Sequence, residues 1–237
     1  MQRGGQVNEL INIRAIYPTS YSHIKAFEQC PKQFYHAKHL NEYPFTESVD
    51  TLYGKQAHKV AEDYVISDAP IPSKFEYMRP VLDALKKKEG NKFAEIKLGI
   101  TEDLVPCTFF SKQVWIRGII DLLVVNKSKK LAWVIDYKTS KNAKYADPDQ
   151  LELMALLVFA SYPEVEEIRG GLVFVKCNEL VRKKYQKIKR SELWSKWIAK
   201  HKKMLEAHKL DRWPTRESGL CRNHCPVQEC IHNGANN

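Results

Sequence analysis

Apolar residues recur at helical spacing in several parts of the chain. The clearest case is residues 52–66, where apolar side chains return every three or four positions and predict an amphipathic helix. The same spacing predicts helices over residues 74–89, 150–162 and 190–209. Residues 19–40 begin with hydroxyl side chains suited to a helix N-cap, and Pro31 divides this segment into two helical pieces.

A second pattern, rich in β-branched and aromatic residues, predicts strands. Extended segments are expected over residues 93–100, 114–126 and 131–138, and a polar connection of hairpin length, KSKK, joins the last two. A buried strand is expected at residues 170–177, after the helix at 150–162. The order helix, antiparallel strands, helix, strand indicates an α/β or α+β domain.

Composition and charge narrow the class of protein. The 237 residues fit one sizeable domain with a small appended element, and 38 Lys and Arg against 28 Asp and Glu give a formal net charge of +10. This sign suits a protein that approaches a polyanion, although solvated lysines would give the same excess. No segment has the apolar length of a signal peptide or a membrane span. We therefore expect a soluble, cytoplasmic protein that makes no membrane contact, in the host cytoplasm if it is phage-encoded.

Candidate chemistry lies in the predicted hairpin. Side chains alternate along a strand, so Asp136 and Lys138 project to the same face. Asp121 stands in an otherwise apolar run, where an isolated carboxylate costs several kcal/mol unless it is paired or binds a metal. Two carboxylates on adjacent strands would suit Mg²⁺ or Mn²⁺, and Lys138 could position the attacking water. Taken alone, the Asp–x–Lys triplet is better explained by a simple cross-strand Asp–Lys ion pair on a solvated sheet face.

The order of these motifs resembles a known family. Gly118-Ile-Ile-Asp121, then Val134-Ile-Asp136-Tyr-Lys138-Thr139, then Gln150 opening a helix, is similar to the RecB-like branch of the PD-(D/E)XK nuclease superfamily. That branch includes the nuclease domains of RecB and AddB and related CRISPR-associated and phage nucleases. The resemblance implies a restriction-endonuclease-like α/β fold, a mixed central sheet flanked by helices, with Asp121, Asp136, Lys138 and Gln150 as catalytic residues.

The resemblance covers residues 20–230 and assigns further residues. Gly54-Lys-Gln-Ala-His58 matches the family's G-x-x-x-H helix, which implies that His58 joins Asp121 and Asp136 at the metal. Glu95 matches an acidic catalytic residue that precedes the hairpin. His58 could instead form a surface pair with Glu62, and Glu95 could simply be solvated. Met154 departs from the family, which often has tyrosine there, so a DNA contact at this position is in doubt.

The cysteines suggest a second metal centre. Cys221, Cys225 and Cys230 fall within ten residues, with His224 and His232 close by, a density that packing alone does not explain. In related nucleases one early cysteine and three near the C-terminus hold an iron–sulfur cluster, and Cys30 matches the early one. The resemblance thus implies a [4Fe–4S] cluster, while the C-x₃-C-x₄-C spacing and the histidines leave Zn²⁺ open. Cys107 and Cys177 are interpreted as buried or incidental thiols.

Two basic stretches, residues 181–190 and the lysines of the helix at 190–209, could contact phosphates. They are interleaved with Tyr185, Trp194 and Trp197, any of which could stack on an unpaired base. The helical spacing of Trp197 nevertheless favours a place in the core.

We expect residues 1–18 to be an N-terminal extension, residues 19–213 a nuclease domain, and residues 214–237 a cysteine-rich tail that packs on the N-terminal helices through its metal centre. The expected activity is divalent-metal-dependent cleavage of DNA that is single-stranded or has single-stranded ends, by an exonuclease of recombination, repair or phage DNA processing. A recombination or replication protein and a second copy of the chain are possible partners. The alternative is a non-catalytic DNA-binding or adaptor protein that retains the fold.

Overall fold

The computed structural model describes residues 18–44, 46–144 and 146–236. The chain divides into two compact units: the larger spans Glu47–Trp194, and the smaller combines Met1–Thr46 with Ser195–Asn237. The predicted N-terminal extension lies outside the described residues, except for Pro18. Within the described ranges, no helix has the length and apolar character needed to cross a lipid bilayer.

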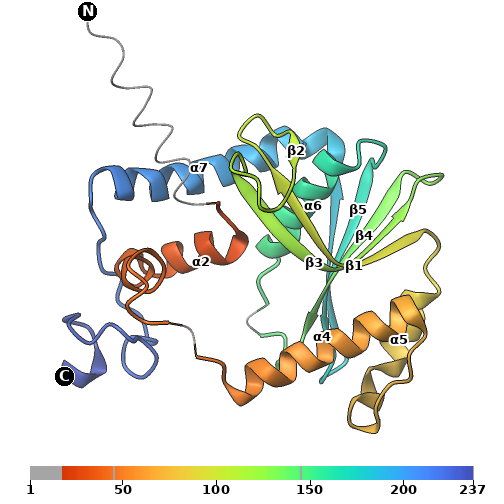
Figure 1. The fold of residues 1–237 in the computed structure, drawn as a ribbon, viewed down its shortest axis with the longest axis horizontal. Helices are drawn as coiled ribbons and strands as arrows, with labels where there is room; N and C mark the ends of the chain where they lie inside the picture. The colour runs from red at the N-terminus through yellow and green to blue at the C-terminus, as the bar shows by residue number, and fades with distance from the viewer. Residues whose placement is uncertain (1–17, 45, 145, 237) are drawn as a thin grey trace, which may run out of the picture. The chain divides into compact units, whose positions relative to one another are not determined.

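The larger unit is built on a mixed six-stranded sheet with the order β2-β1-β3-β4-β5-β6 (Figure 1). The strands are β1 (Asn91–Ile100), β2 (Pro106–Cys107), β3 (Ile116–Asn126), β4 (Leu131–Lys138), β5 (Glu167–Phe174) and β6 (Glu179–Gln186). β4 and β5 are parallel, and the other neighbouring pairs are antiparallel. Parallel strands need a crossover, which α6 (Asp149–Ser161) supplies. The predicted α/β fold, a mixed sheet flanked by helices, is confirmed.

The strand predictions are correct at the centre of the sheet and incomplete at its edges. The β3–β4 hairpin forms as expected, but β5 begins and ends three residues earlier than predicted. The two-residue strand β2 was not expected, and β6 was interpreted only as a basic stretch. β6 is an edge strand whose single fully buried side chain is Tyr185, so it lacks the apolar alternation that marks a strand.

Helices cover both faces of this sheet. On one face, α4 (Val49–Ser67), the 3₁₀ turn η2 (Ser73–Met78) and α5 (Arg79–Lys86) pack against β3, β4 and β5. On the other face lies α6, which buries apolar side chains on every side. The single helix predicted over residues 74–89 is wrong. Pro80 lacks an N–H and its ring would clash with the carbonyl four residues earlier, so the α-helix starts only at Arg79.

The hydrogen-bonded register of β1 and β3 is interrupted at one pair of opposed residues, Glu95 and Asp121. The pairs on either side of them are Ala94 with Leu122 and Ile96 with Ile120. The φ angle of Glu95 is 47°, in the left-handed region. Such a conformation costs a non-glycine residue about 1–3 kcal/mol and is found mostly at functional sites.

This interruption makes the side chains of β3 change faces. Beyond it, Leu122 and Val124 pack with the residues of α4 and α5. Before it, Gly118 lies against Leu157 of α6. Gly118, Leu122 and Val124 are all even-numbered positions of the same strand. An uninterrupted strand would keep them on one face. Asp121 therefore lies where the side chains of β3 change from one face of the sheet to the other.

Gly90, just before β1, is a position in the larger unit where a side chain cannot be accommodated without moving backbone. Its φ is 131°, and an added Cβ would lie 2.5 Å from the carbonyl oxygen of Val125. We expect Gly90→Ala to lower the free energy of unfolding by about 3 kcal/mol, because backbone and not a flexible side chain would have to move. Urea unfolding measures this. Gly219→Ala, at a site with no heavy atom within 4 Å of the added Cβ, is the control, and equal midpoints for the two variants would contradict the prediction.

The smaller unit contains α2 (Tyr21–Gln29), α3 (Pro31–Phe34), the π-helical turn η1 (Tyr35–His39), most of α7 (Arg190–Lys209) and the 3₁₀ turn η4 (Gly234–Asn236). Ser20 caps α2 by accepting from the His23 N–H, and the predicted break falls at Cys30 with Pro31 opening the next helix. Phe27, Phe34 and Met204 form its apolar centre, against which Trp213 packs.

Candidate active site

Asp136, Lys138 and Gln150 form a closed triangle on the α6 side of the sheet. Lys138 Nζ lies 2.6 Å from Asp136 Oδ2 and donates to Gln150 Oε1 at 2.8 Å. Gln150 Nε2 donates to Asp136 Oδ1 at 2.5 Å. Alternation along β4 puts the first two side chains on one face, and the first turn of α6 brings the glutamine to them.

His58, Glu95 and Asp121 form a second group on the α4 side. One ligand atom from each lies within 4.8 Å of the others. His58 Nδ1 is 3.4 Å from Asp121 Oδ2 and 3.8 Å from Glu95 Oε1. The other ring nitrogen, Nε2, is 3.0 Å from the Tyr137 carbonyl oxygen. A carbonyl can only accept, so Nε2 carries a proton and Nδ1 is the nitrogen that faces the carboxylates.

The charges of this second group are strongly coupled. Burial by itself lowers the pKa of His58, but its interactions with Asp121 and Glu95 outweigh burial and raise the pKa to about 10. In the absence of another cation, the imidazolium therefore balances the carboxylates. A metal ion that bound Nδ1 would have to replace this proton.

Asp121 joins the two groups. Its Oδ2 accepts the backbone N–H of Tyr137 at 2.7 Å, a bond possible because the β3–β4 register ends at Leu122 and Ile135. Burial and the charge of Asp121 raise the pKa of Asp136 to about 6, against the effects of Lys138 and His58. Asp136 Oδ2 is buried and, despite its ion pair with Lys138, makes no hydrogen bond of good geometry. It keeps an acceptor lone pair for a cation.

The structure thus gathers every residue predicted for the catalytic site, in two adjoining groups. Asp136 is not part of the group formed by His58, Glu95 and Asp121. Asp121 lies between the two groups because it accepts the N–H of Tyr137, the residue next to Asp136. Glu62 pairs with Lys59 at 3.5 Å, and His58 faces Asp121, so the surface pair of His58 with Glu62 is not the arrangement found.

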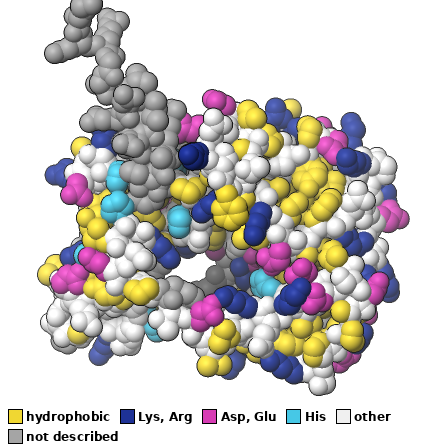
Figure 2. Space-filling model, viewed as in Figure 1, with side chains coloured by type: hydrophobic (Ala, Val, Ile, Leu, Met, Phe, Trp, Pro, Cys, Tyr) yellow, Lys and Arg dark blue, Asp and Glu magenta, His cyan; other side chains and the backbone are white. Residues whose placement is uncertain are grey.

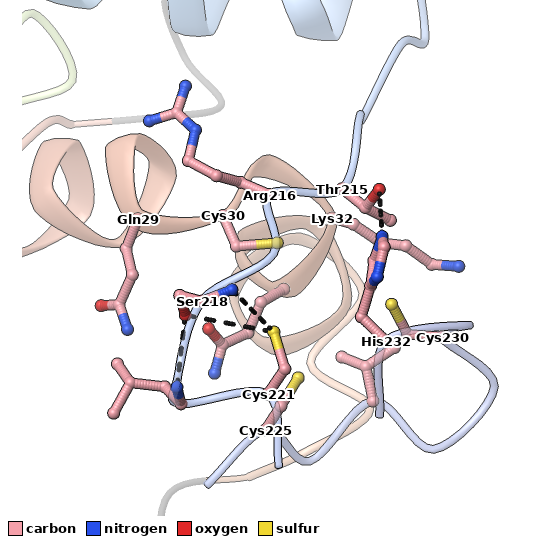
Figure 3. A pocket seen from close by; sticks show the side chains of 13 residues that line it. Gln29, Cys30, Lys32, Thr215, Arg216, Ser218, Cys221, Cys225, Cys230 and His232 are labelled. Carbon is pink, nitrogen blue, oxygen red and sulfur yellow. Dashed lines mark hydrogen bonds between the residues drawn. The ribbon is translucent and has the colours of Figure 1, made fainter. Parts of the chain in front are cut away.

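The four cysteines predicted to hold a second metal centre lie around one small cavity in the smaller unit (Figure 3). Cys30 comes from the break between α2 and α3, and Cys221, Cys225 and Cys230 come from the C-terminal segment. The Ser218 N–H donates to Cys221 Sγ at 3.4 Å. His232 also lines the cavity, whereas Cys107 and Cys177 belong to the larger unit.

The thiols around this cavity disfavour one another's ionisation. Burial raises the pKa of the Cys225 thiol, and charge on Cys221, Cys230 and Cys30 would raise it further. Four thiolates could share the cavity only if a metal centre offset their repulsion.

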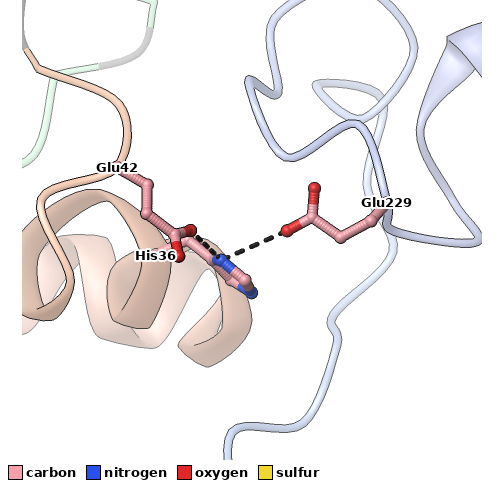
Figure 4. Close-up of side chains that lie close together, drawn as sticks. All are labelled: His36, Glu42 and Glu229. Atoms are coloured by element: carbon pink, nitrogen blue, oxygen red, sulfur yellow. Dashed lines mark hydrogen bonds and ion pairs between the residues drawn. The ribbon is translucent and has the colours of Figure 1, made fainter.

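A second charged cluster lies in the smaller unit (Figure 4). His36 Nδ1 is 2.5 Å from Glu42 Oε2 and 3.2 Å from Glu229 Oε1, and the Tyr43 hydroxyl donates to Glu229 Oε2 at 3.0 Å. Both carboxylates are about half exposed. We interpret the cluster as an ion-pair network that attaches the C-terminal segment to η1.

The aromatic residues proposed for base stacking are not available for it. Tyr185, Trp194 and Trp197 are 8%, 4% and 0% exposed. Tyr185 donates to the Pro148 carbonyl, and the ring of Trp194 packs against Trp115 at 5.8 Å. The prediction that Trp197 belongs to the core is confirmed, and the stacking role suggested for all three is wrong because each faces inward. Met154 is also buried, so it offers no DNA contact.

A mixed sheet that carries clustered carboxylates, a lysine and a glutamine beside its crossover helix defines a restriction-endonuclease-like fold. The family model of the PD-(D/E)XK nuclease superfamily matches residues 18–230, and the chain belongs to this superfamily. The RecB- and AddB-like branch within it stays a prediction.

One solved structure shows the same fold at low sequence identity. A "putative exonuclease" from Eubacterium rectale is 12% identical, with a TM-score of 0.54 over 98% of this chain and 96% of that chain. A second structure, of the protein SSO0001, is 14% identical, with a TM-score of 0.40 over 94% of this chain and 95% of that chain. No curated protein matches the chain.

Proposed function

We propose that this nuclease hydrolyses phosphodiester bonds of DNA with the help of Mg²⁺ or Mn²⁺. The observation that carries the proposal is the bonded triangle of Asp136, Lys138 and Gln150, next to Asp121 on the Tyr137 N–H, in a chain of the PD-(D/E)XK superfamily. These residues come from two strands and a helix, so only the folded chain assembles them.

The donor set fits a hard divalent cation. His58 Nδ1, Glu95 and Asp121 supply one group of ligand atoms, and Asp136 Oδ2 is a buried oxygen with an acceptor position to spare. Carboxylate oxygens are the preferred ligands of Mg²⁺, and Mn²⁺ also accepts an imidazole. When bound, such an ion supplies Lewis acidity and lowers the pKa of a coordinated water.

Lys138 and Gln150 have separable roles in this proposal. The ammonium of Lys138 is one-third exposed and can offset negative charge that builds up on a phosphate. Gln150 holds both the ammonium and Asp136, and so keeps the lysine turned toward the substrate side.

We expect Gln150→Leu to lower kcat by about 10–100-fold, the usual cost of losing a group that orients catalytic residues. The fold should persist, because leucine suits the apolar surroundings of α6. Gln186→Leu is the matched control, since the side chain of that exposed glutamine on β6 donates to Glu167 at 3.3 Å, away from the candidate site. Equal rates for the two variants would show that Gln150 does not position the site.

Action at DNA ends is supported by the name of the Eubacterium rectale structure, which is described as an exonuclease. An exonuclease of recombination, repair or phage DNA processing would fit this chain. The test is degradation of end-labelled linear DNA, covalently closed circular DNA and RNA, with Mg²⁺, Mn²⁺ or a chelator. Ordered release of nucleotides from linear DNA alone supports the proposal. Cutting of circles would indicate an endonuclease, and no cleavage of any substrate would favour the adaptor.

The cysteine cavity supports a [4Fe–4S] cluster as a structural cofactor held by Cys30, Cys221, Cys225 and Cys230. In a tetrahedral zinc site, Zn–S bonds of about 2.3 Å place the sulfur atoms roughly 3.8 Å apart. Among the described residues, these cysteines do not form a group of three ligand atoms within 4.8 Å of one another. The choice of the larger cluster over zinc rests on the resemblance of Cys30 and the three late cysteines to the cluster ligands of related nucleases. The tail from residue 214 would then be attached to the N-terminal helices through this centre.

A further inference from the structure

The part of β1 and β3 beyond Glu95 and Asp121 presents an exposed face. Lys97 and Ile119 are opposed in the register and both are exposed, with Ile119 38% accessible. The alternate residues Leu98 and Ile120 are buried. Gly118 lies against α6, so Lys97, Ile119 and Arg117 project to the opposite side of the sheet.

Two phenylalanines extend this face. Phe109 and Phe110 lie in the connection between β2 and β3, with ring centroids 5.0 Å apart in an edge-to-face arrangement. Phe110 is 75% exposed. A large aromatic side chain in water is costly to maintain and indicates a binding surface when charged groups surround it.

Cations hold these rings in place. Arg117 donates to the Phe109 carbonyl at 3.2 Å, and its guanidinium carbon lies 4.7 Å from the Phe109 ring centroid and 5.9 Å from that of Phe110. Lys97 Nζ lies 5.8 Å from the Phe110 centroid. We call Lys97, Phe109, Phe110, Arg117 and Ile119 the aromatic–basic strip. In Figure 2, hydrophobic and basic side chains gather on this face of the larger unit beside acidic side chains and a histidine.

The strip leads to the candidate active site. Arg117 precedes Asp121 by four residues on the same strand, a distance of about 13 Å at the usual rise of a β-strand. Lys97 follows Glu95 by two residues on the neighbouring strand. At a stacked spacing of about 3.4 Å, 13 Å corresponds to roughly four nucleotides.

We propose that the aromatic–basic strip binds single-stranded nucleic acid next to the carboxylates. Phe110 stacks on an unpaired base, and Lys97 and Arg117 neutralise phosphates on either side of it. A duplex would hide its base faces from the ring, whereas a frayed or single-stranded end exposes them. The inference rests on the proposed function only in placing the scissile phosphate near Glu95 and Asp121, so binding can be tested apart from cleavage.

The test uses the full chain carrying Asp136→Asn, which should bind without cutting, and fluorescence anisotropy with a labelled single-stranded oligonucleotide and the matching blunt duplex. Adding Phe110→Ala should weaken single-strand binding by about tenfold, the typical effect of removing one stacking ring, and leave duplex binding unchanged. Adding Lys97→Ala should reduce the salt dependence of single-strand binding, with the logarithmic slope falling by about 0.7 for one lost phosphate contact. Ile66→Ala, which removes a 44% exposed apolar side chain elsewhere on the larger unit, is the control and should bind as its parent does.

Three results would overturn the inference: no single-strand binding by the parent, equal binding by the Phe110→Ala and Ile66→Ala chains, or an equal loss of duplex and single-strand binding in Phe110→Ala. The middle result would fit a strip that docks a protein. If single-strand binding depends on Phe110 but the wild-type chain cuts no substrate, the result would support binding by the aromatic–basic strip and refute the proposed nuclease activity.

Discussion

The Asp136→Asn substitution is expected to abolish metal-dependent cleavage. The Asp136→Asn side chain keeps the shape of the original and can still meet Gln150, but it removes the charge that faces Lys138 and a bound cation. Metal-based stabilisation of the transition state contributes several kcal/mol, so kcat should fall at least about 1000-fold. Initial rates on end-labelled DNA with Mn²⁺ measure the effect. Lys138→Ala should behave similarly, and Asp63→Asn, at an exposed pair with Lys59, should not.

Stability separates lost chemistry from lost folding in this experiment. The pKa of Asp136 is raised to about 6, so the folded chain disfavours its ionised form more than the unfolded chain does. Metal-free wild type should therefore lose stability as the pH rises from about 4 to 6, and Asp136→Asn should lack this loss. At pH 8 the variant should unfold at or above the wild-type temperature. Mn²⁺ should raise the melting temperature of the wild type alone. An Asp136→Asn chain that is fully active, or one that is unfolded, would contradict the assignment of Asp136 to the metal site.

Loss of one cysteine ligand is expected to remove the second metal centre. In Cys221→Ser, an alcohol replaces the thiol beside the Ser218 N–H. The C-terminal segment would then lose the proposed metal–sulfur bonds, which compensate for its small apolar core. Binding of a structural metal by small domains contributes about 10–16 kcal/mol, so its loss should leave the segment from residue 214 onward open to proteases. Iron, sulfide and zinc analysis after anaerobic purification, with limited proteolysis, checks both outcomes.

Cys177→Ser is the matched control for that experiment. Cys177 lies in the larger unit, where its thiol donates to the Phe174 carbonyl at 3.9 Å, so this variant should keep its iron and its protease resistance. One bound zinc without broad visible absorption in the wild type would refute the iron–sulfur proposal. Metal retained in Cys221→Ser would refute the ligand set.

Sequence patterns located the centre of the larger unit well because its strands are buried. β3 and β4 are rich in β-branched, aromatic and other apolar residues with a polar turn between them, and the helix after them is apolar on every side. Alternation along β4 also placed Asp136 and Lys138 on one face correctly. The edges were harder, since an exposed strand such as β6 has almost no burial to leave a periodic signal.

The aromatic residues show a different limit. Tyr185 and Trp194 looked available for nucleic acid because lysines surround them in the sequence, yet both face inward. Phe110 stands in a loop without periodicity, so its exposure could be learned only from the fold. Neighbours in sequence determine charge density, but the path of the backbone determines which side of an element meets solvent.

The sequence by itself determined the fold class through local periodicity and the grouping of the late cysteines through their spacing, and the order of motifs that resembles the family supplied the candidate catalytic residues. Only the tertiary structure decided how these residues meet. The left-handed turn at Glu95 interrupts the β1–β3 register, and the end of the β3–β4 register frees the Tyr137 N–H for Asp121. His58 then reaches the same carboxylate from α4. These contacts join residues up to 79 positions apart, so no local pattern encodes them, and packing of the helices on the sheet brings them together.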